Sequence, residues 1–185
     1  YRMTEKQKKE ISYQEYKTEV LQDYKTAVLS RECSLMGRRE VLTGKAKFGI
    51  FGDGKELAQI ALAKVFRHGD FRAGYYRDQA LMTALGQYSP KHMFSALYGD
   101  PELEREPSSG SRQMMNHFGT RFLNDDGSWK NLMEQNNSTS DMACLASQFP
   151  RLVGLAQASQ VYRDNPELAK NKPGFTNGGN EIAFA

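Results

Sequence analysis

Apolar residues recur at helical spacing through most of the chain. Ser12 and Glu15 have the spacing of a capping box, and the helical pattern that begins there runs to about Leu42, just before Gly44. It predicts a helical arm over residues 1–44, roughly 45 Å long in its helical part, which packs a single apolar stripe along a larger body. The stripe contains Tyr13, Tyr16, Val20, Tyr24, Ala27, Val28, Leu35, Met36, Val41 and Leu42.

Shorter helices follow, and each carries an apolar face that we expect to be buried. The predicted ranges are 55–66, 78–85, 89–98 and 145–162, with Pro90 suited to the first turn of its helix. The residues expected to face inward on the first and last of these helices are Leu57, Ile60, Ala61 and Val65, and Leu145, Phe149, Leu152, Val153 and Ala156.

Extended structure is predicted in two places. Residues 70–76 form an extended segment that runs into the helix at 78–85, and the apolar run 181–185 is typical of a buried parallel strand. Because the chain starts at Tyr1 and stops within such a run, we expect it to be a single incomplete domain, a piece of a longer protein.

Arg77 stands at an unusual position, directly before a helix start. The first turn of a helix has unpaired N–H groups and a partial positive charge, so a cation there is mildly disfavoured. An anion, most simply a phosphate, would explain Arg77 if the guanidinium, the helix amides and the Tyr76 hydroxyl held it together. The alternative, which the sequence leaves open, is that Asp78 caps the helix and Arg77 lies in solvent.

Residues 101–143 are predicted to form a long loop, because about half of them are Gly, Pro, Ser, Thr, Asn or Asp and no periodic segment is visible. Residues 111–117 bring together a guanidinium, two methionines and the imidazole of His117, which favours a functional role. Phe118, Phe122 and Trp129 are apolar anchors that a disordered linker would lack. The alternative for His117 is an ordinary surface histidine.

Composition narrows the class of protein. The net charge is +3, from 25 basic and 22 acidic residues in 185, which argues against general nucleic-acid binding. Cys33 and Cys144 lie far apart, as expected for reduced thiols in a cytoplasmic protein. No apolar run has the length of a membrane span and no signal peptide is visible, so no membrane partner is expected.

A series of short motifs, in order and with compatible gaps, resembles the alpha-type part of thiamine-diphosphate-dependent 2-oxoacid dehydrogenases. The branched-chain, or 2-oxoisovalerate, type is the nearest match, from about residue 30 to the last residue. The motifs are Gly54-Lys55-Glu56, Asp70, Tyr76-Arg77, Tyr98-Gly99, Arg112-Gln113-Met114, His117, Leu145-Ala146-Ser147-Gln148, Pro150 and Val153-Gly154.

The resemblance implies a fold and an activity. The fold would be α/β: the N-terminal part of a thiamine-diphosphate-binding fold, mostly helical here, with its first parallel strand at the C-terminal end. Residues 45–100 would be the cofactor diphosphate region, 101–143 the active-site loop, and 144–185 a helix and the first central strand. Such enzymes, which act in branched-chain amino acid catabolism, decarboxylate a 2-oxo acid on thiamine diphosphate and transfer the acyl group to a lipoyl domain.

The resemblance also implies roles for individual residues. Tyr75, Tyr76 and Arg77 would hold the cofactor diphosphate, and Leu145 would meet its aminopyrimidine ring. His117 would be catalytic and would contact the substrate. The remaining expected contacts are Phe48, Arg112 and Met114 for the substrate, and Ser147 and Gln148 for a monovalent cation such as K⁺.

Two departures and several missing parts accompany this resemblance. Lys55 stands where the family usually has Gln or a small polar residue, and residues 142–144 (Met-Ala-Cys) replace a Ser-Ser-Pro that would supply two oxygens to the cation site. The Mg²⁺ ligands are expected beyond Ala185. The cofactor-activating glutamate would belong to a beta-type half or subunit, so this chain alone is expected to be inactive.

The expected partners are that beta-type half, in a homo- or hetero-oligomer, and a lipoyl-bearing dihydrolipoyl acyltransferase. Two alternatives stay open at this point. One is another thiamine-diphosphate enzyme, acetoin-cleaving or transketolase-like. The other is a non-enzymatic helical interaction module.

Overall fold

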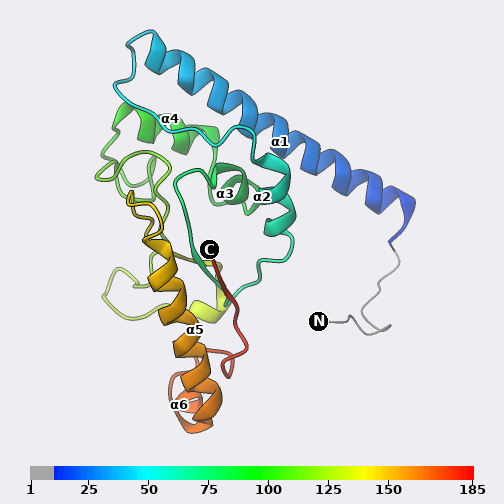
Figure 1. Ribbon diagram of the computed structural model, residues 1–185, viewed down its shortest axis with the longest axis vertical. Helices are drawn as coiled ribbons and strands as arrows, with labels where there is room; N and C mark the ends of the chain where they lie inside the picture. The colour runs from blue at the N-terminus through cyan, green and yellow to red at the C-terminus, as the bar shows by residue number, and fades with distance from the viewer. Residues whose placement is uncertain (1–10) are drawn as a thin grey trace.

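The computed structural model describes residues 11–185 and consists of helices around a small parallel sheet. The long helix α1 lies across α2, α3 and α4, and α5 and α6 extend at the other end of the molecule (Figure 1). The elements are α1 (Tyr13–Leu42), α2 (Glu56–Ala63), β1 (Phe71–Ala73), α3 (Gln79–Ala84), α4 (Pro90–Tyr98), the 3₁₀ helix η2 (Leu132–Glu134), β2 (Asn137–Thr139), α5 (Gln148–Asp164), α6 (Pro166–Asn171) and β3 (Ala183–Phe184).

Local capping signals predicted the helix ends well. The Ser12 hydroxyl accepts a hydrogen bond from the Glu15 amide, and the Glu15 carboxylate accepts one from the Ser12 amide at 2.8 Å, which confirms the capping box. Ser89 caps α4, Pro90 occupies the first turn, and Gly99 ends the helix with a φ of 75°.

The sheet has the order β2-β1-β3 and all its strands are parallel. Phe71 pairs with Asn137 on one side and with Ala183 on the other, so β1 is central. The C-terminal run does form a parallel strand, β3, which has two residues and pairs with β1 in the described part of the chain. That it is the first central strand of a larger sheet stays a prediction. The predicted structureless loop 101–143 is wrong in part, because it contains η2 and β2.

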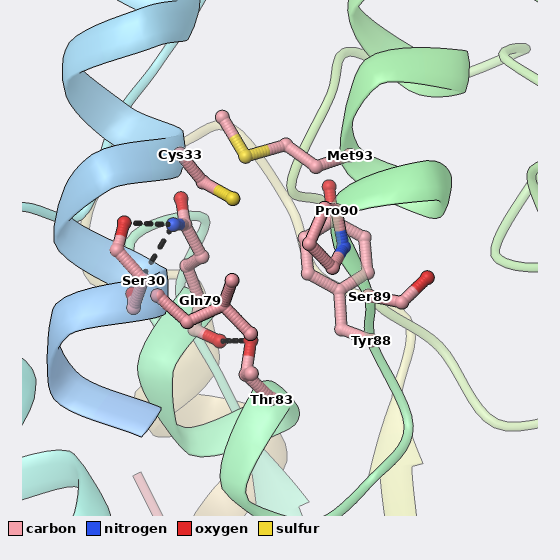
Figure 2. A pocket seen from close by; sticks show the side chains of 9 residues that line it. Ser30, Cys33, Gln79, Thr83, Tyr88, Ser89, Pro90 and Met93 are labelled. Carbon is pink, nitrogen blue, oxygen red and sulfur yellow. Dashed lines mark hydrogen bonds between the residues drawn. The ribbon is translucent and has the colours of Figure 1, made fainter. Parts of the chain in front are cut away.

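The buried face of α1 differs from the prediction. Tyr13, Tyr24 and Leu42 of the apolar stripe are 77%, 66% and 81% exposed. The residues that face the body of the molecule are instead small or polar: Thr26, Ser30, Cys33, Ser34 and Gly37. Small side chains allow α3 to approach closely, and the Gln79 side-chain amide then donates a 2.8 Å hydrogen bond to the Ser30 carbonyl (Figure 2).

The predicted apolar faces of α2 and α5 are also wrong in most positions. Ile60 is buried as expected, but Leu57 and Val65 are exposed, and Glu56 and Gln59 occupy the inner face of α2. On α5, Phe149 and Val153 are exposed, and Ser159 is the buried residue. Leu145 lies before the helix start and is 78% exposed. Their apolar periodicity therefore marks surfaces that this chain does not cover itself.

The main apolar core lies between α1, α4 and the segment before β2. Its buried members are Cys33, Ala46, Met82, Tyr88, Met93, Leu97, Met115 and Phe118. A cavity of about 10 Å³ adjoins the Cys33 thiol and the Tyr88 ring (Figure 2), which is room for about one water molecule. Within residues 11–185, none of the helices has the length and apolarity that crossing a lipid bilayer requires.

Candidate functional site

The turn that joins β1 to α3 carries the first group of candidate residues. It follows the carboxyl end of a central parallel strand, the edge at which α/β proteins usually bind ligands. The Asp78 carboxylate accepts a 3.0 Å hydrogen bond from the Tyr75 amide and makes no cap bond to α3. Asp78 occupies the N-cap position of α3, but its side chain makes no cap bond, so the alternative is wrong in that part; its other part, that Arg77 lies in solvent, is confirmed.

The sequence predicts that the first backbone amides of α3 are free to bind an anion, but two of them already have hydrogen-bond partners in the structure. The Gln59 side-chain oxygen accepts hydrogen bonds from the amides of Ala80 and Leu81, at 3.0 and 3.2 Å, and its nitrogen donates to the Arg77 carbonyl at 2.8 Å. Gln59 thus satisfies the helix start and fixes the backbone at Arg77. The Ala80 and Leu81 amides are therefore already hydrogen-bonded and do not serve as donors for an anion at this turn.

Arg77 itself is exposed, and its guanidinium lies 6.0 Å from the centre of the Tyr76 ring. Within residues 11–185 it forms no ion pair. Gly52 packs against its backbone so closely that a Cβ there would lie 2.6 Å from the Arg77 carbonyl oxygen. The backbone at Arg77 is therefore held while its charged group faces solvent.

Tyr75 and Tyr76 form a pair beside this arginine. Their ring centroids are 3.9 Å apart, and the Tyr75 hydroxyl donates a hydrogen bond to the Tyr76 hydroxyl. That hydrogen bond, with a smaller contribution from burial, raises the pKa of Tyr75. Because the single Tyr75 hydroxyl proton is used in that bond, the Tyr76 hydroxyl is the member of the pair that is able to donate to an oxyanion.

His117 also lies beside Tyr76, with 5.5 Å between the ring centroids. It is 5% exposed, so the surface-histidine alternative is wrong. Its Nδ1 lies 3.0 Å from the Met114 carbonyl oxygen, which assigns the proton to Nδ1 because a carbonyl only accepts. Nε2 is buried and has no hydrogen-bond partner among the described residues.

Phe48 and Met114 lie on a second feature, a surface hollow of about 450 Å³ between the segment after α1 and the end of α4. Both side chains are exposed, and the Met114 backbone is the hydrogen-bond partner of His117. Arg112 is turned toward its own loop, where its guanidinium donates to the Ser109 carbonyl at 3.1 Å.

The residues expected at the pyrimidine and the cation site lie in the turn before α5. The Ser147 hydroxyl donates to the Cys144 carbonyl at 2.7 Å, and Gln148 is the first residue of α5. Arg151 of α5 donates to the Ser140 carbonyl, which ties this turn to the end of β2. The roles of Leu145, Ser147 and Gln148 stay predictions. No cluster of His, Cys, Asp or Glu suited to a metal ion occurs in the described part of the chain.

Sequence reasoning missed Arg72, the residue at the centre of this region. Its side chain is completely buried and pairs with Asp78 at 2.7 Å and with Asp141 at 3.0 Å. Burial alone would lower the pKa of Arg72, but the two carboxylates raise it above its ordinary value. Burial raises the pKa of Asp141, and Arg72 opposes that change. An arginine between Phe71 and Ala73, in a segment predicted to be extended, was the available signal.

No protein-family model matches the chain. The chain is 27% identical over 177 residues to the 2-oxoisovalerate dehydrogenase subunit alpha of Bacillus subtilis strain 168, an alignment that covers 89% of this chain and 47% of that protein. It therefore spans about half the length of this curated relative. The similarity is distant, and it supports the 2-oxoacid dehydrogenase family without selecting a particular member.

Proposed function

We propose that this chain is the alpha-type part of a thiamine-diphosphate-dependent 2-oxoacid dehydrogenase, acting on a branched-chain 2-oxo acid. The observation that carries the proposal is the group at the carboxyl end of β1. There an exposed arginine, two stacked tyrosines and a buried histidine with an unpartnered nitrogen lie together. The distant relative named above is an alpha subunit of such a dehydrogenase.

The residues present fit a diphosphate. Arg77 supplies a charged fork of N–H donors, and the Tyr76 hydroxyl, which Tyr75 orients by its own hydrogen bond, adds a neutral one. One arginine compensates only part of the charge of a diphosphate, so a Mg²⁺ ion held by residues beyond Ala185 would complete the site. When bound, thiamine diphosphate supplies the nucleophilic carbon at which a 2-oxo acid loses its carboxylate.

His117 would act on the substrate at Nε2. In the neutral ring with Nδ1 donating to the Met114 carbonyl, Nε2 would accept a proton or a hydrogen bond from the 2-oxo acid. Once protonated there, the imidazolium donates from both nitrogens and pairs with a carboxylate. Burial of the ring keeps bulk water away from that nitrogen.

The apolar part of the substrate would lie near Met114. The hollow shared by Phe48 and Met114 offers two large apolar side chains for a branched acyl chain, and Arg112 would contact the carboxylate after leaving its present bond to Ser109. We further propose that Leu145 contacts the aminopyrimidine and that Ser147 and Gln148 hold a K⁺ ion beside it.

The exposed apolar faces support partner subunits. Leu42 on α1 and Phe149 and Val153 on α5 are large apolar side chains exposed to solvent. Covering them with a partner subunit would remove apolar surface from water and stabilise the assembly. We propose a beta-type subunit or half as the partner that covers them. The acyl product would pass to the lipoyl arm of a dihydrolipoyl acyltransferase.

Calorimetric titration of the intact protein with thiamine diphosphate and Mg²⁺ tests the proposal. Arg77→Ala should weaken binding by about 1.5–3 kcal/mol, the value of a charge-assisted hydrogen bond. The matched control is Arg67→Ala, because Arg67 is also exposed but precedes β1 rather than following it. Unchanged affinity in Arg77→Ala, or an equal loss in both variants, would reject the proposed diphosphate site.

A further inference from the structure

The ion pair between Arg72 and Asp141 is the most deeply buried charge pair of the described residues. Both side chains have 0% exposure, whereas the Asp78 side chain is 24% exposed. Arg72 points from the central strand β1, and Asp141 comes two residues after the end of β2. The pair therefore bridges the carboxyl ends of two neighbouring parallel strands.

Every donor position of the Arg72 guanidinium is used. Nε donates to Asp78 at 3.1 Å, Nη1 donates to Ser138 and to Asp141, and Nη2 donates to Asp78, Asp141 and the Tyr75 carbonyl. Gly74 makes room for this arrangement, because a Cβ there would lie 1.7 Å from the guanidinium carbon. A lysine has a single charged nitrogen and would not reach all these acceptors at once.

These bonds hold both halves of the candidate site. On one side, Arg72 binds the Tyr75 carbonyl and Asp78, which flank Tyr76 and Arg77. On the other side, the Asp141 carboxylate accepts a 3.1 Å hydrogen bond from the Phe118 amide, and the Asp141 amide donates to the Phe118 carbonyl at 2.8 Å. Phe118 follows His117 directly, so the pair links the backbone on either side of the contact between the Tyr76 and His117 rings.

Stability alone is a poor explanation for such a pair. Removing two charges from water costs about as much as their attraction returns, and apolar replacements of similar volume are often neutral or stabilising. What apolar side chains would not reproduce is the set of directed bonds to the turn and to residues 117–118. The contribution that an apolar core would not supply is therefore the fixed position of the turn and of residues 117–118, not additional stability.

We infer that Arg72 and Asp141 are positioning residues that hold the turn of Tyr75, Tyr76 and Arg77 against His117 in the orientation that receives the cofactor diphosphate. This inference rests on the proposed diphosphate site. It assigns no contact with the cofactor to either residue.

Removing the charge of Asp141 distinguishes a positioning role from a purely electrostatic one, because the two roles predict opposite changes in the affinity for thiamine diphosphate. Asp141→Asn removes a negative charge near the proposed anion site, so the electric field alone predicts tighter binding of thiamine diphosphate. Loss of positioning predicts the reverse, because the neutral amide no longer fixes Arg72 and the Phe118 amide. We expect Asp141→Asn to bind thiamine diphosphate with Mg²⁺ about tenfold more weakly in calorimetry.

A charge-neutral double replacement separates positioning from stability. Arg72→Met with Asp141→Leu removes both buried charges and keeps the net charge, and we expect its melting temperature to stay close to that of the wild type. Its affinity for thiamine diphosphate should still fall about tenfold. The control is Met93→Ala, a core variant away from this turn, which should lower the melting temperature while leaving affinity within about twofold of wild type.

The Arg77→Ala variant distinguishes the proposed positioning role of Arg72 and Asp141 from the proposed diphosphate site itself. If Arg72 acts through Arg77, adding the double replacement to Arg77→Ala should change affinity by less than about twofold. Affinity within about twofold of wild type in the double replacement, or tighter binding in Asp141→Asn, would overturn the positioning role. If Arg77→Ala binds normally, the diphosphate site itself is wrong. Should the double replacement unfold, Arg72→Lys is judged by the same affinity criterion.

Discussion

Glu56 should make the protein acid-sensitive through one contact between α1 and α2. Its carboxylate accepts hydrogen bonds from Arg31 Nε at 2.7 Å and Arg31 Nη2 at 2.9 Å, and from the Gly54 amide at 3.0 Å. The Arg31 guanidinium is the main reason that the pKa of Glu56 falls to about 2. Replacing Glu56 by Gln removes the charge and keeps the shape.

The structure sets the size of the effect. A fall from 4.5 to about 2 is worth at most about 3.4 kcal/mol, at about 1.4 kcal/mol per pKa unit. The Glu56 side chain is 7% exposed but Arg31 is 47% exposed, so water screens part of the attraction. We therefore expect Glu56→Gln to lower the free energy of unfolding at pH 7 by about 1.5–2.5 kcal/mol.

The pH dependence gives the sharper test. A carboxyl whose pKa is lowered by folding stabilises the protein above its unfolded pKa, near 4.5, and loses that contribution as the pH falls toward 2. Urea unfolding at several pH values should show the gap between wild type and Glu56→Gln closing over this range. Exposed Glu102, changed to Gln, is the control and should show little gap. A gap at pH 7 that persists unchanged to pH 3 would refute the charge-based explanation.

Two further predictions concern the site. His117→Ala in the intact enzyme should lower kcat or raise KM for the 2-oxo acid while cofactor affinity stays within about twofold; wild-type kinetics would make His117 an ordinary buried residue. Gly74→Ala should cost about 1–3 kcal/mol of stability in thermal denaturation, because its Cβ would overlap the Arg72 guanidinium. The helical Gly154 has open space around it, so Gly154→Ala should be neutral or slightly stabilising, and equal effects at both glycines would contradict this explanation.

Helix ends were predictable because their signals are local. The Ser12 capping box, Pro90 and Gly99 act within a few residues, so the sequence contains the whole interaction. Helix faces were not predictable in the same way. Ser30 and Ser34 are buried because Gln79, more than 40 residues later, provides hydrogen bonds to them. The spacing of apolar and polar residues along α1 does not indicate that Gln79 is the partner.

The second strand was missed for a related reason. Residues 137–139 are polar and look like a loop, yet Asn137 and Ser138 are buried in β2. The Asn137 side chain donates to the Leu132 carbonyl at 2.8 Å, and the Ser138 amide donates to the Thr120 hydroxyl. Side-chain and backbone partners satisfy the polar groups, so burial carries no large cost.

Part of the candidate site could be predicted because a cation directly before a helix start, as at Arg77, is unusual in the sequence itself. The unusual feature of Arg72, a charged side chain buried in a central strand, exists only once the sheet is assembled. Asp141 lies 69 positions from Arg72 in the chain, and no short motif joins them. A pairing of this kind becomes visible only through the parallel alignment of β1 with β2.

The unpartnered Nε2 of His117 is significant because the other buried polar side chains around β1 have hydrogen-bond partners. Arg72, Gln79 and Asn137 are completely or almost completely buried, and each has hydrogen-bond partners. Among described residues, only His92 Nδ1 and His117 Nε2 are buried side-chain polar atoms without one. His92 lies on α4 beside Tyr88, whereas His117 lies against Tyr76 of the turn after β1. A buried polar atom left without a partner among otherwise satisfied groups is costly, so a ligand that bonds to Nε2 would recover that cost.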